Sequence, residues 1–277
     1  MILSKTPFRL SFVGGGSDLP SHYKEYGGSV ISTSIDKYMY VSVHKNFDNR
    51  TRVSYSRLED VENIDNIKHP IARNALNLFE VSGVEIASMA DIPALGTGLG
   101  SSSSYAVGLC NCLASYKKLN VSRDDLAKYA CKIEIEMCKE PIGKQDQYSA
   151  SFGNFNKIDF HKNGTVDVTK LKLEKAFLRL LESSTLFFYV GIDRAASTIL
   201  SEQNERTKNG FNQKYLSEMV ALVEPFSLAL SSSSLDNIAK LLNANWELKK
   251  KLSSNITNSI VDQAYETAKK NGAIGGK

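Results

Sequence analysis

The sequence predicts a protein of mixed strands and helices that forms two domains. The first third alternates apolar and other side chains with the period of two that half-buried strands show, whereas helical patterns dominate from Ala196 onward. The character of the chain changes between residues 165 and 185. Because 277 residues are many for one compact domain, we expect a mixed N-terminal domain at 1–170 and a second domain at 171–277.

The N-terminal domain begins with strands and a helix in a definite order. Residues 8–13 and 38–43 have the strand-like alternation. The stretch "HPIARNALNLFEVSG" (69–83) has helical spacing, with Gly83 as its expected stop. A short apolar strand, "VEIASMADI" (84–92), then leads into a segment rich in glycine and serine.

Two further helices and a hairpin complete this domain. A largely buried helix is expected at Tyr105–Leu119. A second helix follows Ser122, whose side chain can cap it together with Asp125 in an approximate capping box, and Pro141 marks its end. Residues 153–164 are typical of a strand and hairpin.

The second domain is expected to open with a buried strand, "STLFFYVGI" (184–192), and to continue in helices. A run of four serines, Ser231–Ser234, has no glycine nearby. It is interpreted as a turn between two helices, with Ser234 as the cap of the second. Four consecutive serines therefore carry little functional information by themselves.

Composition and charge exclude several classes of protein. The net charge is +4, hydrophobic residues make up 42% and charged residues 23%, and acidic residues are interspersed with the basic ones, which disfavours a nucleic-acid partner. The densest basic spot, Lys249–Lys251, is interpreted as a solvated helix face. No apolar run reaches the roughly 18 residues of a membrane helix, and "MILSKTPFRL" lacks the apolar core of a secretory signal. We expect a cytoplasmic protein without a membrane partner.

The four cysteines are too few for a disulfide framework in a chain of this length. Cys110 and Cys112 form a C-x-C on the expected buried helix, without a second pair or nearby histidines. We interpret all four as reduced cysteines, mostly of the core, rather than as a metal site.

The stretch "PALGTGLGSSSSYAVGL" (Pro93–Leu109) is the strongest functional signal. It is either a flexible linker or a loop shaped around an anion. Alternating glycines let backbone N–H groups approach a ligand, and the first turn of a helix adds unpaired N–H groups and a positive dipole end. Because the segment follows a strand and precedes an apolar helix, it favours phosphate binding. The candidate residues are Gly96, Thr97, Gly98, Leu99, Gly100, Ser101, Ser102, Ser103 and Ser104.

The two common nucleotide-binding loops do not match this segment. A P-loop requires a lysine before its Ser or Thr, and a dinucleotide fingerprint requires G-x-G-x-x-G, whereas the chain has G-x-G-x-G without lysine. The charge of a triphosphate must then be offset by the helix dipole, by a metal ion or by residues from elsewhere.

A second glycine cluster lies in "TPFRLSFVGGGSDLP", where a strand that carries Arg9 ends in three glycines followed by Ser17 and Asp18. One interpretation is a tight turn in which Asp18 is a turn or cap residue. The other is a ligand site, where Gly15 and Gly16 leave room for a bulky ligand and Asp18 accepts hydrogen bonds from its hydroxyl groups. The pattern alone leaves both open.

Two carboxylates form a third constellation. Glu134 borders the apolar face of the helix after Ser122, whereas Glu136 points toward solvent, so Glu134 is the better ligand candidate. Asp146 follows Pro141 on a segment expected to be irregular, where active-site residues often lie. One carboxylate could serve as a general base while the other holds a metal ion.

These three pieces together resemble the GHMP kinases, the family named for galactokinase, homoserine, mevalonate and phosphomevalonate kinases. "PFRLSFVGGGSDLP", "PALGTGLGSSSS" and "IEIEMCKEPIGKQDQY" look like its first motif, its ATP-binding motif and the segment with its magnesium ligand and catalytic aspartate. The resemblance implies an α+β fold, in which an N-terminal domain like the second domain of ribosomal protein S5 precedes a ferredoxin-like C-terminal domain.

The resemblance also implies a role for individual residues. It places Asp146 as catalytic base with Arg9 beside it, and Glu134 and Ser102 as ligands of Mg²⁺, with ATP bound by the Gly96–Ser104 loop. Asp18 matches the aspartate that binds substrate hydroxyls. The implied reaction is ATP-dependent phosphorylation of a sugar.

Departures from the family pattern narrow the range of possible substrates. Where galactokinases have Glu-His, this chain has Gly15 and Gly16, and its motifs look instead like those of bacterial D-glycero-D-manno-heptose 7-phosphate kinases, with fucokinases as close relatives. The implied product is a heptose 1,7-bisphosphate for GDP-heptose and surface glycans such as capsule or lipopolysaccharide. The 7-phosphate needs a cationic partner, for which Arg194 is the candidate, with Ser197 as a further contact; the alternative is that Arg194 is an ordinary surface arginine.

Other hypotheses stay open. A fucokinase-like or galactokinase-like sugar 1-kinase, a catalytically silent ATP or sugar sensor on the same fold, and a Gly/Ser-linked interaction protein are the alternatives, and the sequence leaves open whether the chain forms a homo-oligomer. "NGAIGGK" looks like the opening of the family's third, glycine-rich motif, so we expect the C-terminal domain to be incomplete at Lys277.

Overall fold

A computed structural model describes residues 1–93, 97–189 and 196–277. The chain forms two compact units that interleave along the sequence. Unit 1 comprises Met1–Leu10 and Ser34–Asn154, and unit 2 comprises Ser11–Thr33 and Phe155–Lys277. This grouping differs from a single division after residue 170, because residues 11–33 belong with the C-terminal part of the chain.

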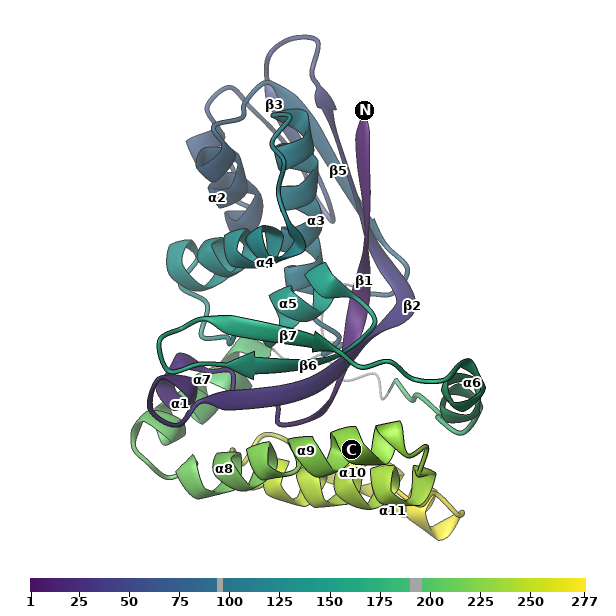
Figure 1. Cartoon of the computed structure of the whole chain (residues 1–277). Helices are drawn as coiled ribbons and strands as arrows, with labels where there is room; N and C mark the ends of the chain where they lie inside the picture. Colours follow the sequence, from purple (N-terminus) through teal and green to yellow (C-terminus); the bar gives the residue numbers. More distant parts are fainter. Residues whose placement is uncertain (94–96, 190–195) are drawn as a thin grey trace. The chain divides into compact units, whose positions relative to one another are not determined.

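The described elements of unit 1 are those of a sheet with helices packed on it (Figure 1). They comprise the start of β1 (Ile2–Val13), the end of β2 (Gly28–Lys45), β3 (Thr51–Ser54), β4 (Leu58–Val61), a 3₁₀ turn η1 (Ile64–Asn66), α2 (Pro70–Phe79), β5 (Val84–Ala90), α3 (Ser101–Tyr116), α4 (Arg123–Cys131), a π-helical turn η2 (Lys132–Met137) and α5 (Gln145–Phe152). The strand order is β4-β3-β5-β2, with β1 paired to β2. β2 and β5 are antiparallel, with Val41 opposite Ser88, whereas β3 and β5 are parallel.

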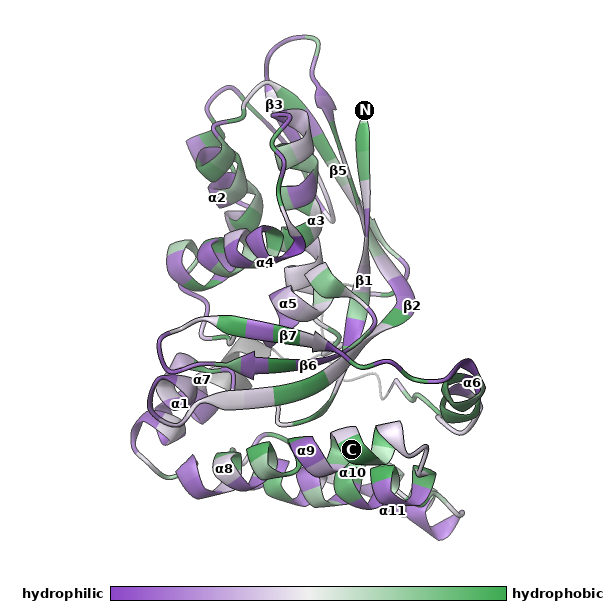
Figure 2. Ribbon diagram, in the orientation of Figure 1, coloured by the Kyte–Doolittle hydropathy of each residue, from purple (hydrophilic) through white to green (hydrophobic). Residues whose placement is uncertain are grey.

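The alternation predicted at 38–43 is confirmed, because Met39, Val41 and Val43 of β2 are buried and the residues between them are half-buried. The alternation predicted at 8–13 is wrong beyond Phe8, because residues 9–12 are all half-buried and Val13 is buried. Figure 2 colours both strands by hydropathy. The core combines Phe8 and Val41 from the sheet with Leu76, Leu109 and Ile133 from the helical layer. Full burial of a large apolar side chain stabilises the fold by roughly 1.5–3 kcal/mol, so this layer holds the helices firmly on the sheet.

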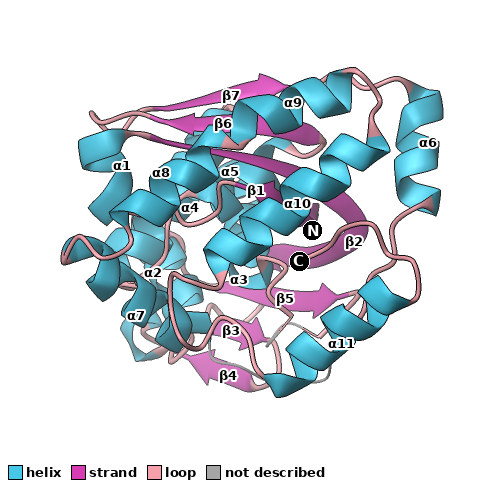
Figure 3. Ribbon diagram, turned by 90° about the horizontal axis from the view of Figure 1, so that it is seen from below, coloured by secondary structure: helices cyan, strands magenta, loops and turns pink. Residues whose placement is uncertain are grey.

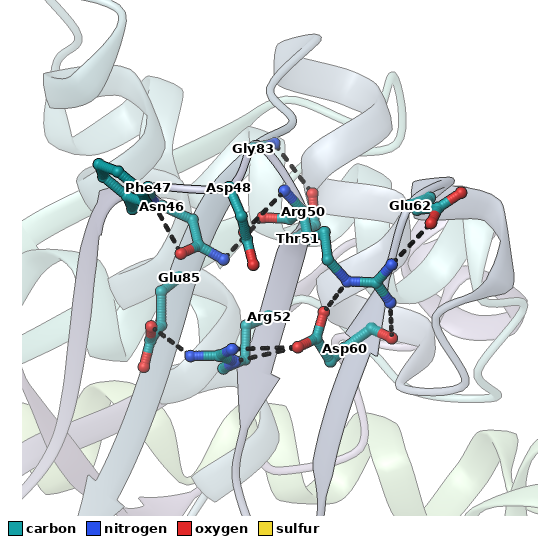
Figure 4. Close-up of polar contacts among 10 residues, drawn as sticks. All are labelled: Asn46, Phe47, Asp48, Arg50, Thr51, Arg52, Asp60, Glu62, Gly83 and Glu85. Carbon is teal, nitrogen blue, oxygen red and sulfur yellow. Dashed lines mark hydrogen bonds and ion pairs between the residues drawn. The ribbon is translucent and has the colours of Figure 1, made fainter.

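Polar contacts organise the edge of this sheet (Figure 4). Asp60 on β4 accepts hydrogen bonds from two arginines: its Oδ1 lies 2.6 Å from Arg50 Nε, and its Oδ2 lies 3.0 Å from Arg52 Nη2. Arg52 also reaches Glu85 on β5, at 3.2 Å. The network joins β3, β4 and β5 on a partly exposed face.

The helix boundaries follow local chemistry and correct three expectations. Helix α2 ends at Phe79 because Glu80 adopts a left-handed conformation (φ 52°), so Gly83 is not its stop. Helix α3 begins at Ser101, four residues earlier than expected, and ends at Tyr116. The capping box of Ser122 and Asp125 is confirmed at the start of α4, but the helix changes to π-helical geometry after Cys131.

Unit 2 combines a hairpin with helices (Figure 3). Its described elements are the end of β1, α1 (Pro20–Tyr26), the start of β2, β6 (Phe155–Phe160), β7 (Val166–Lys170), α6 (Lys175–Ser183), α7 (Ala196–Lys208), α8 (Gln213–Ala221), α9 (Val223–Ser231), α10 (Leu235–Lys249) and α11 (Ser259–Lys270). The expected hairpin is confirmed as β6 and β7, and β6 also pairs with the start of β2. Helix α10 packs against α8 and α9, and Phe226 of α9 contacts Phe12 at a centroid separation of 5.5 Å.

Two expectations for the second domain have opposite outcomes. Ser234 caps α10 as predicted, since its Oγ accepts from the N–H of Asn237 at 3.4 Å. The buried strand expected at 184–192 is wrong in its described part. Residues 185–189 form no strand, and the exposed fractions of Leu186 and Phe188 are 79% and 69%, because no strand among the described residues pairs with this segment.

The expected core role of the cysteines is confirmed for three of them. Cys110, Cys112 and Cys131 are buried, Cys138 is half-buried, and all four are free thiols. Burial raises the pKa of Cys110, so this thiol stays protonated and inert. Among the residues that the structure describes, no helix is both long enough and apolar enough to cross a membrane.

Candidate active site

The glycine- and serine-rich segment forms a loop that enters helix α3 in unit 1. Gly98 and Gly100 have positive φ angles of 67° and 76°, and Gly100 is the residue before the first helical turn. All four serines lie in that turn, and the N–H of Ser104 donates to the carbonyl of Gly100 at 2.9 Å. The first N–H groups of a helix have no carbonyl one turn before them in the same helix to accept from them. The arrangement supports an anion cradle at the helix N-terminus. Gly96 lies outside the described residues.

The serine side chains of this turn have different hydrogen-bond partners. Ser104 Oγ donates to the carbonyl of Pro7 at 2.9 Å and ties α3 to β1. The hydroxyls of Ser102 and Ser103 hydrogen-bond to Glu134. Ser103 is buried, whereas Ser102 is exposed, so the exposed hydroxyl can reach a ligand in the cradle while the other positions the carboxylate.

Arg9 and Asp146 form a paired contact at the end of this loop. Arg9 Nε lies 2.7 Å from Asp146 Oδ1 and Arg9 Nη2 lies 2.6 Å from Oδ2, the two-pronged geometry in which a guanidinium binds a carboxylate most strongly. The exposed fractions of the two side chains are 11% and 24%. The third nitrogen, Nη1, donates to the carbonyl of Gly98 at 2.8 Å, and the backbone N–H of Arg9 donates to Leu99. Arg9 therefore holds both the carboxylate and the loop.

Gly100 is required where the loop passes this pair. A Cβ atom at position 100 would lie 3.3 Å from both Arg9 Cγ and Asp146 Oδ2, and its φ of 76° strains a residue with a side chain. Asp146 itself is the second residue of α5, so the expectation of an irregular segment is wrong. Its position in the first turn of a helix fixes the carboxylate on rigid backbone.

Glu134 lies in the π-helical turn after α4. The turn is marked by the bond from the N–H of Cys138 to the carbonyl of Ile133 at 2.8 Å, and such turns are frequent at functional sites. The side chain is 1% exposed, whereas Glu136 is exposed, as the sequence pattern predicted. Burial raises the pKa of Glu134 to about 7, against the opposing effect of hydrogen bonds from the serine hydroxyls and Gln147.

Gln147 is a site residue whose role the sequence did not reveal. Its Nε2 donates to Glu134 Oε2 at 2.7 Å, and its Oε1 is buried without a hydrogen-bond partner. Because Gln147 directly follows Asp146, the sequence shows that it lies near the candidate base. The sequence does not show that its side chain points toward Glu134. Glu134, Ser102 and Gln147 together offer oxygen atoms, the ligands that Mg²⁺ prefers. A buried carboxylate with a raised pKa and an unpartnered amide oxygen fit a bound divalent cation.

The turn at Gly14–Asp18 belongs to unit 2. The N–H of Gly16 donates to Asp18 Oδ1 at 3.1 Å, and Ser17 Oγ bonds both the carbonyl and the N–H of Ser29 at 3.1 Å. Ser17 and Asp18 are buried, with 0% and 3% exposed. These contacts give Asp18 and Ser17 turn-forming roles, as one of the two interpretations predicted.

Helices α7 and α10 hold this turn in a way that the sequence did not show. Lys249 Nζ lies 3.3 Å from the carbonyl of Gly15 and 3.4 Å from Gln203 Oε1, and Asn245 Oδ1 accepts from the N–H of Gly14. A Cβ at position 16 would collide with the amide of Gln203, whose Nε2 is buried without a partner. Lys249 is half-buried and so does not belong to a solvated face, which corrects the interpretation of Lys249–Lys251.

The structure thus brings together, within unit 1, Arg9, Asp146, Glu134 and the described part of the Gly96–Ser104 loop. Gly15, Gly16, Ser17 and Asp18 form one turn in unit 2. Arg194 lies outside the described residues, and Ser197 lies in α7. Within the described residues there is no cluster of three or more His, Cys, Asp or Glu side chains with metal-binding geometry.

Comparisons with known proteins place the chain among sugar kinases of one family. Residues 66–154 match the model of the GHMP kinases N terminal domain. The chain is 30% identical over 292 residues to D-glycero-alpha-D-manno-heptose 7-phosphate kinase of Campylobacter jejuni, and the match covers 100% of this chain and 85% of that protein. A galactokinase of Thermotoga maritima is 26% identical over 65% of this chain, which spans 52% of that enzyme.

A solved structure shares the fold. A D-glycero-D-manno-heptose 1-phosphate kinase from Bacteroides thetaiotaomicron superposes with a TM-score of 0.81 at 24% identity, over 100% of this chain and 85% of that one. The α+β architecture expected from the motifs is confirmed by this likeness.

Proposed function

The chain belongs to the GHMP kinases, and we propose that it transfers the terminal phosphoryl group of ATP to the C1 hydroxyl of D-glycero-D-manno-heptose 7-phosphate. It is similar over its full length to a kinase of that sugar phosphate. The observation that carries the proposal is the contact of Arg9 with both Asp146 and the loop at Gly98, because it joins a candidate base to a phosphate cradle. The product would be a heptose 1,7-bisphosphate, for GDP-heptose and surface glycans.

Asp146 is proposed to orient and deprotonate the sugar hydroxyl. A carboxylate has about four lone-pair positions, and Arg9 uses one on each oxygen, so lone pairs remain for the hydroxyl proton. A positioned base of this kind contributes about 10²- to 10⁴-fold to the rate. Arg9 also brings positive charge close to the transferred group.

The first turn of α3 is proposed to stabilise the charge of the phosphates. Its N–H groups and dipole end are fixed before the reaction, so they need no reorganisation as charge develops. Glu134, Ser102 and Gln147 would hold Mg²⁺, which supplies neutralisation of phosphate charge when bound. The ionised form of Glu134 is needed for that contact, and Ser103 and Gln147 direct its oxygens.

Sugar recognition is proposed for the turn at Gly15–Asp18 and for α7. The glycines remove bulk, and Asp18 would accept hydrogen bonds from sugar hydroxyls. Arg194 and Ser197 are proposed to bind the 7-phosphate. Arg194→Ala should weaken binding of the 7-phosphate far more than that of the unphosphorylated heptose; equal losses for both sugars would remove Arg194 from this role.

A kinase assay against a panel of sugars tests the proposal. The panel contains phosphorylated and unphosphorylated heptoses and hexoses, fucose and galactose, with ATP and Mg²⁺. We expect the highest kcat/KM for D-glycero-D-manno-heptose 7-phosphate and much lower values for the unphosphorylated sugars. Preference for fucose or galactose would assign a different sugar 1-kinase, and ATP binding without turnover of any sugar would indicate a sensor.

A further inference from the structure

Unit 1 contains a pocket, with a cavity volume of about 320 Å³, that is lined by residues of three elements which also carry active-site residues at other positions. Lys5 precedes Arg9 on β1, Asn111 follows Ser102 on α3, and Ser151 lies at the far end of α5 from Asp146. From the rise per residue of strands and helices, the first two separations are both about 13 Å. The pocket is therefore distinct from the phosphate cradle.

The charge of this pocket is positive. Lys5 and Arg123 line it, and none of its lining residues is an aspartate or glutamate. Within residues 1–93, 97–189 and 196–277, neither cation has an ion-pair partner. Neighbouring carboxylates are engaged elsewhere: Asp36 with the hydroxyl of Tyr38, and Asp125 with Ser122.

Both cations are held in place before any ligand binds. Lys5 Nζ lies 3.7 Å from the centroid of the Tyr38 ring, a cation–π contact that leaves ammonium N–H groups for an acceptor. Arg123 Nη1 donates to the carbonyl of Phe152 at 2.8 Å, and its own carbonyl accepts from Ser151 Oγ. The remaining N–H groups of the guanidinium fork can serve an anion.

The rest of the wall suits a hydroxylated molecule. Asn111 is exposed on α3, where its amide can donate and accept, and the serine hydroxyl of residue 151 lies on the same wall. Buried apolar side chains of Val107 and Leu126 form part of the lining. The volume is at the lower end of the range of about 300–1,000 Å³ that small-molecule sites occupy.

We propose that this pocket binds a small phosphate monoester that carries hydroxyl groups, at a site separate from the one where the kinase reaction takes place. A phosphate monoester is a dianion near neutral pH and matches two cations that face one cavity. Hydroxyl groups on the same ligand match the amide and hydroxyl of the wall. The site goes beyond the proposed function and does not depend on the identity of the phosphorylated sugar.

The test uses the full chain saturated with a non-hydrolysable ATP analogue and Mg²⁺. Glucose 6-phosphate, glycerol 3-phosphate, inorganic phosphate and citrate are titrated in turn by calorimetry. The two monoesters should bind more tightly than inorganic phosphate or citrate. Lys5→Met and Arg123→Gln should each weaken monoester binding by at least about tenfold, as expected for loss of one charge-assisted contact.

Two further variants make the result specific. Asn111→Asp keeps the shape of the side chain but adds a negative charge to the wall, so it should also abolish binding, with the thermal midpoint as the check that it folds. Arg57→Gln is the matched control, because Arg57 is exposed in unit 1 and does not line the pocket; it should bind as the unaltered chain does. Kinase turnover of the Lys5 and Arg123 variants should stay unchanged, which separates this test from that of the proposed function.

The proposal is overturned if the monoesters do not bind, or if their affinity is the same in the Lys5, Arg123 and Arg57 variants. It is equally overturned if Asp146→Asn removes binding as strongly as Arg123→Gln, since the monoester would then occupy the sugar site. Equal affinity for inorganic phosphate and the monoesters would also overturn the proposal, because the pocket would then bind anions without recognising the hydroxyl groups of a monoester.

Discussion

Replacing Glu134 by glutamine should stabilise the metal-free protein at alkaline pH while removing its response to magnesium. The carboxyl is 1% exposed, and burial raises its pKa from 4.5 to about 7. Because one pKa unit corresponds to about 1.4 kcal/mol, the ionised carboxylate costs the folded protein about 3 kcal/mol relative to the unfolded chain. Glutamine has no charge to bury, and it can keep the contacts with Ser102, Ser103 and Gln147.

The pH dependence follows from the direction of this shift. A carboxyl whose folded pKa is raised binds its proton more tightly in the folded state, so stability is lost as pH rises from 4.5 through 7. Above about pH 7 the loss is complete. The advantage of Glu134→Gln over the unaltered chain should therefore be small at pH 5 and approach about 3 kcal/mol at pH 8.

Urea unfolding in EDTA at pH 5 and pH 8 measures this difference. A parallel series with Mg²⁺ and a non-hydrolysable ATP analogue should stabilise the unaltered chain, because the cation offsets the buried charge, and should stabilise the variant much less. A variant less stable than the unaltered chain at pH 8, or a difference in stability that does not change with pH, would mean that the buried charge of Glu134 does not destabilise the folded protein.

Three further substitutions address the loop, the glycine turn and the sheet edge. Gly100→Ala should raise the KM for ATP by about tenfold in steady-state assays, because a left-handed residue with a side chain costs roughly 1–2 kcal/mol; an unchanged KM would mean that the loop conformation is not needed. Lys249→Met removes the contacts with Gly15 and Gln203 and should raise the KM for the sugar by about tenfold while leaving that for ATP unchanged, whereas parallel increases would point to general loosening. Asp60→Asn should lower stability slightly at pH 7 and low salt. The arginines beside Asp60 lower its pKa, so its contribution is lost as pH falls through that lowered value and is screened by salt; a loss that persists at pH 2 or in 1 M NaCl would contradict this.

The sequence predicted the elements whose signal is local. The period of two in β2 and the capping box at Ser122 rest on neighbours a few residues apart, and both are confirmed. The role of Glu134 as a buried carboxylate was also within reach, because its position relative to the apolar face is a property of one helix.

The sequence could not predict features that depend on distant partners. The apolar run at 184–192 has the composition of a buried strand, but a strand needs another strand to pair with, and the described residues 185–189 have none. In the sequence, nothing distinguishes Lys249 from the two lysines that follow it. Its role comes from a contact with Gly15, which is far away in the chain. Gln147 likewise acquires its role only through Glu134.

Asp146 is proposed to act as the base when the sugar is phosphorylated at C1. The most direct measurement is ³¹P NMR of the reaction of ATP with D-glycero-D-manno-heptose 7-phosphate, catalysed by the unaltered chain and by Asp146→Asn. We predict a new phosphate resonance coupled to the anomeric proton with the unaltered chain, a rate about 10²- to 10⁴-fold lower with the variant, and a nearly unchanged affinity for ATP. Formation of the same product by Asp146→Asn at an undiminished rate would contradict the account.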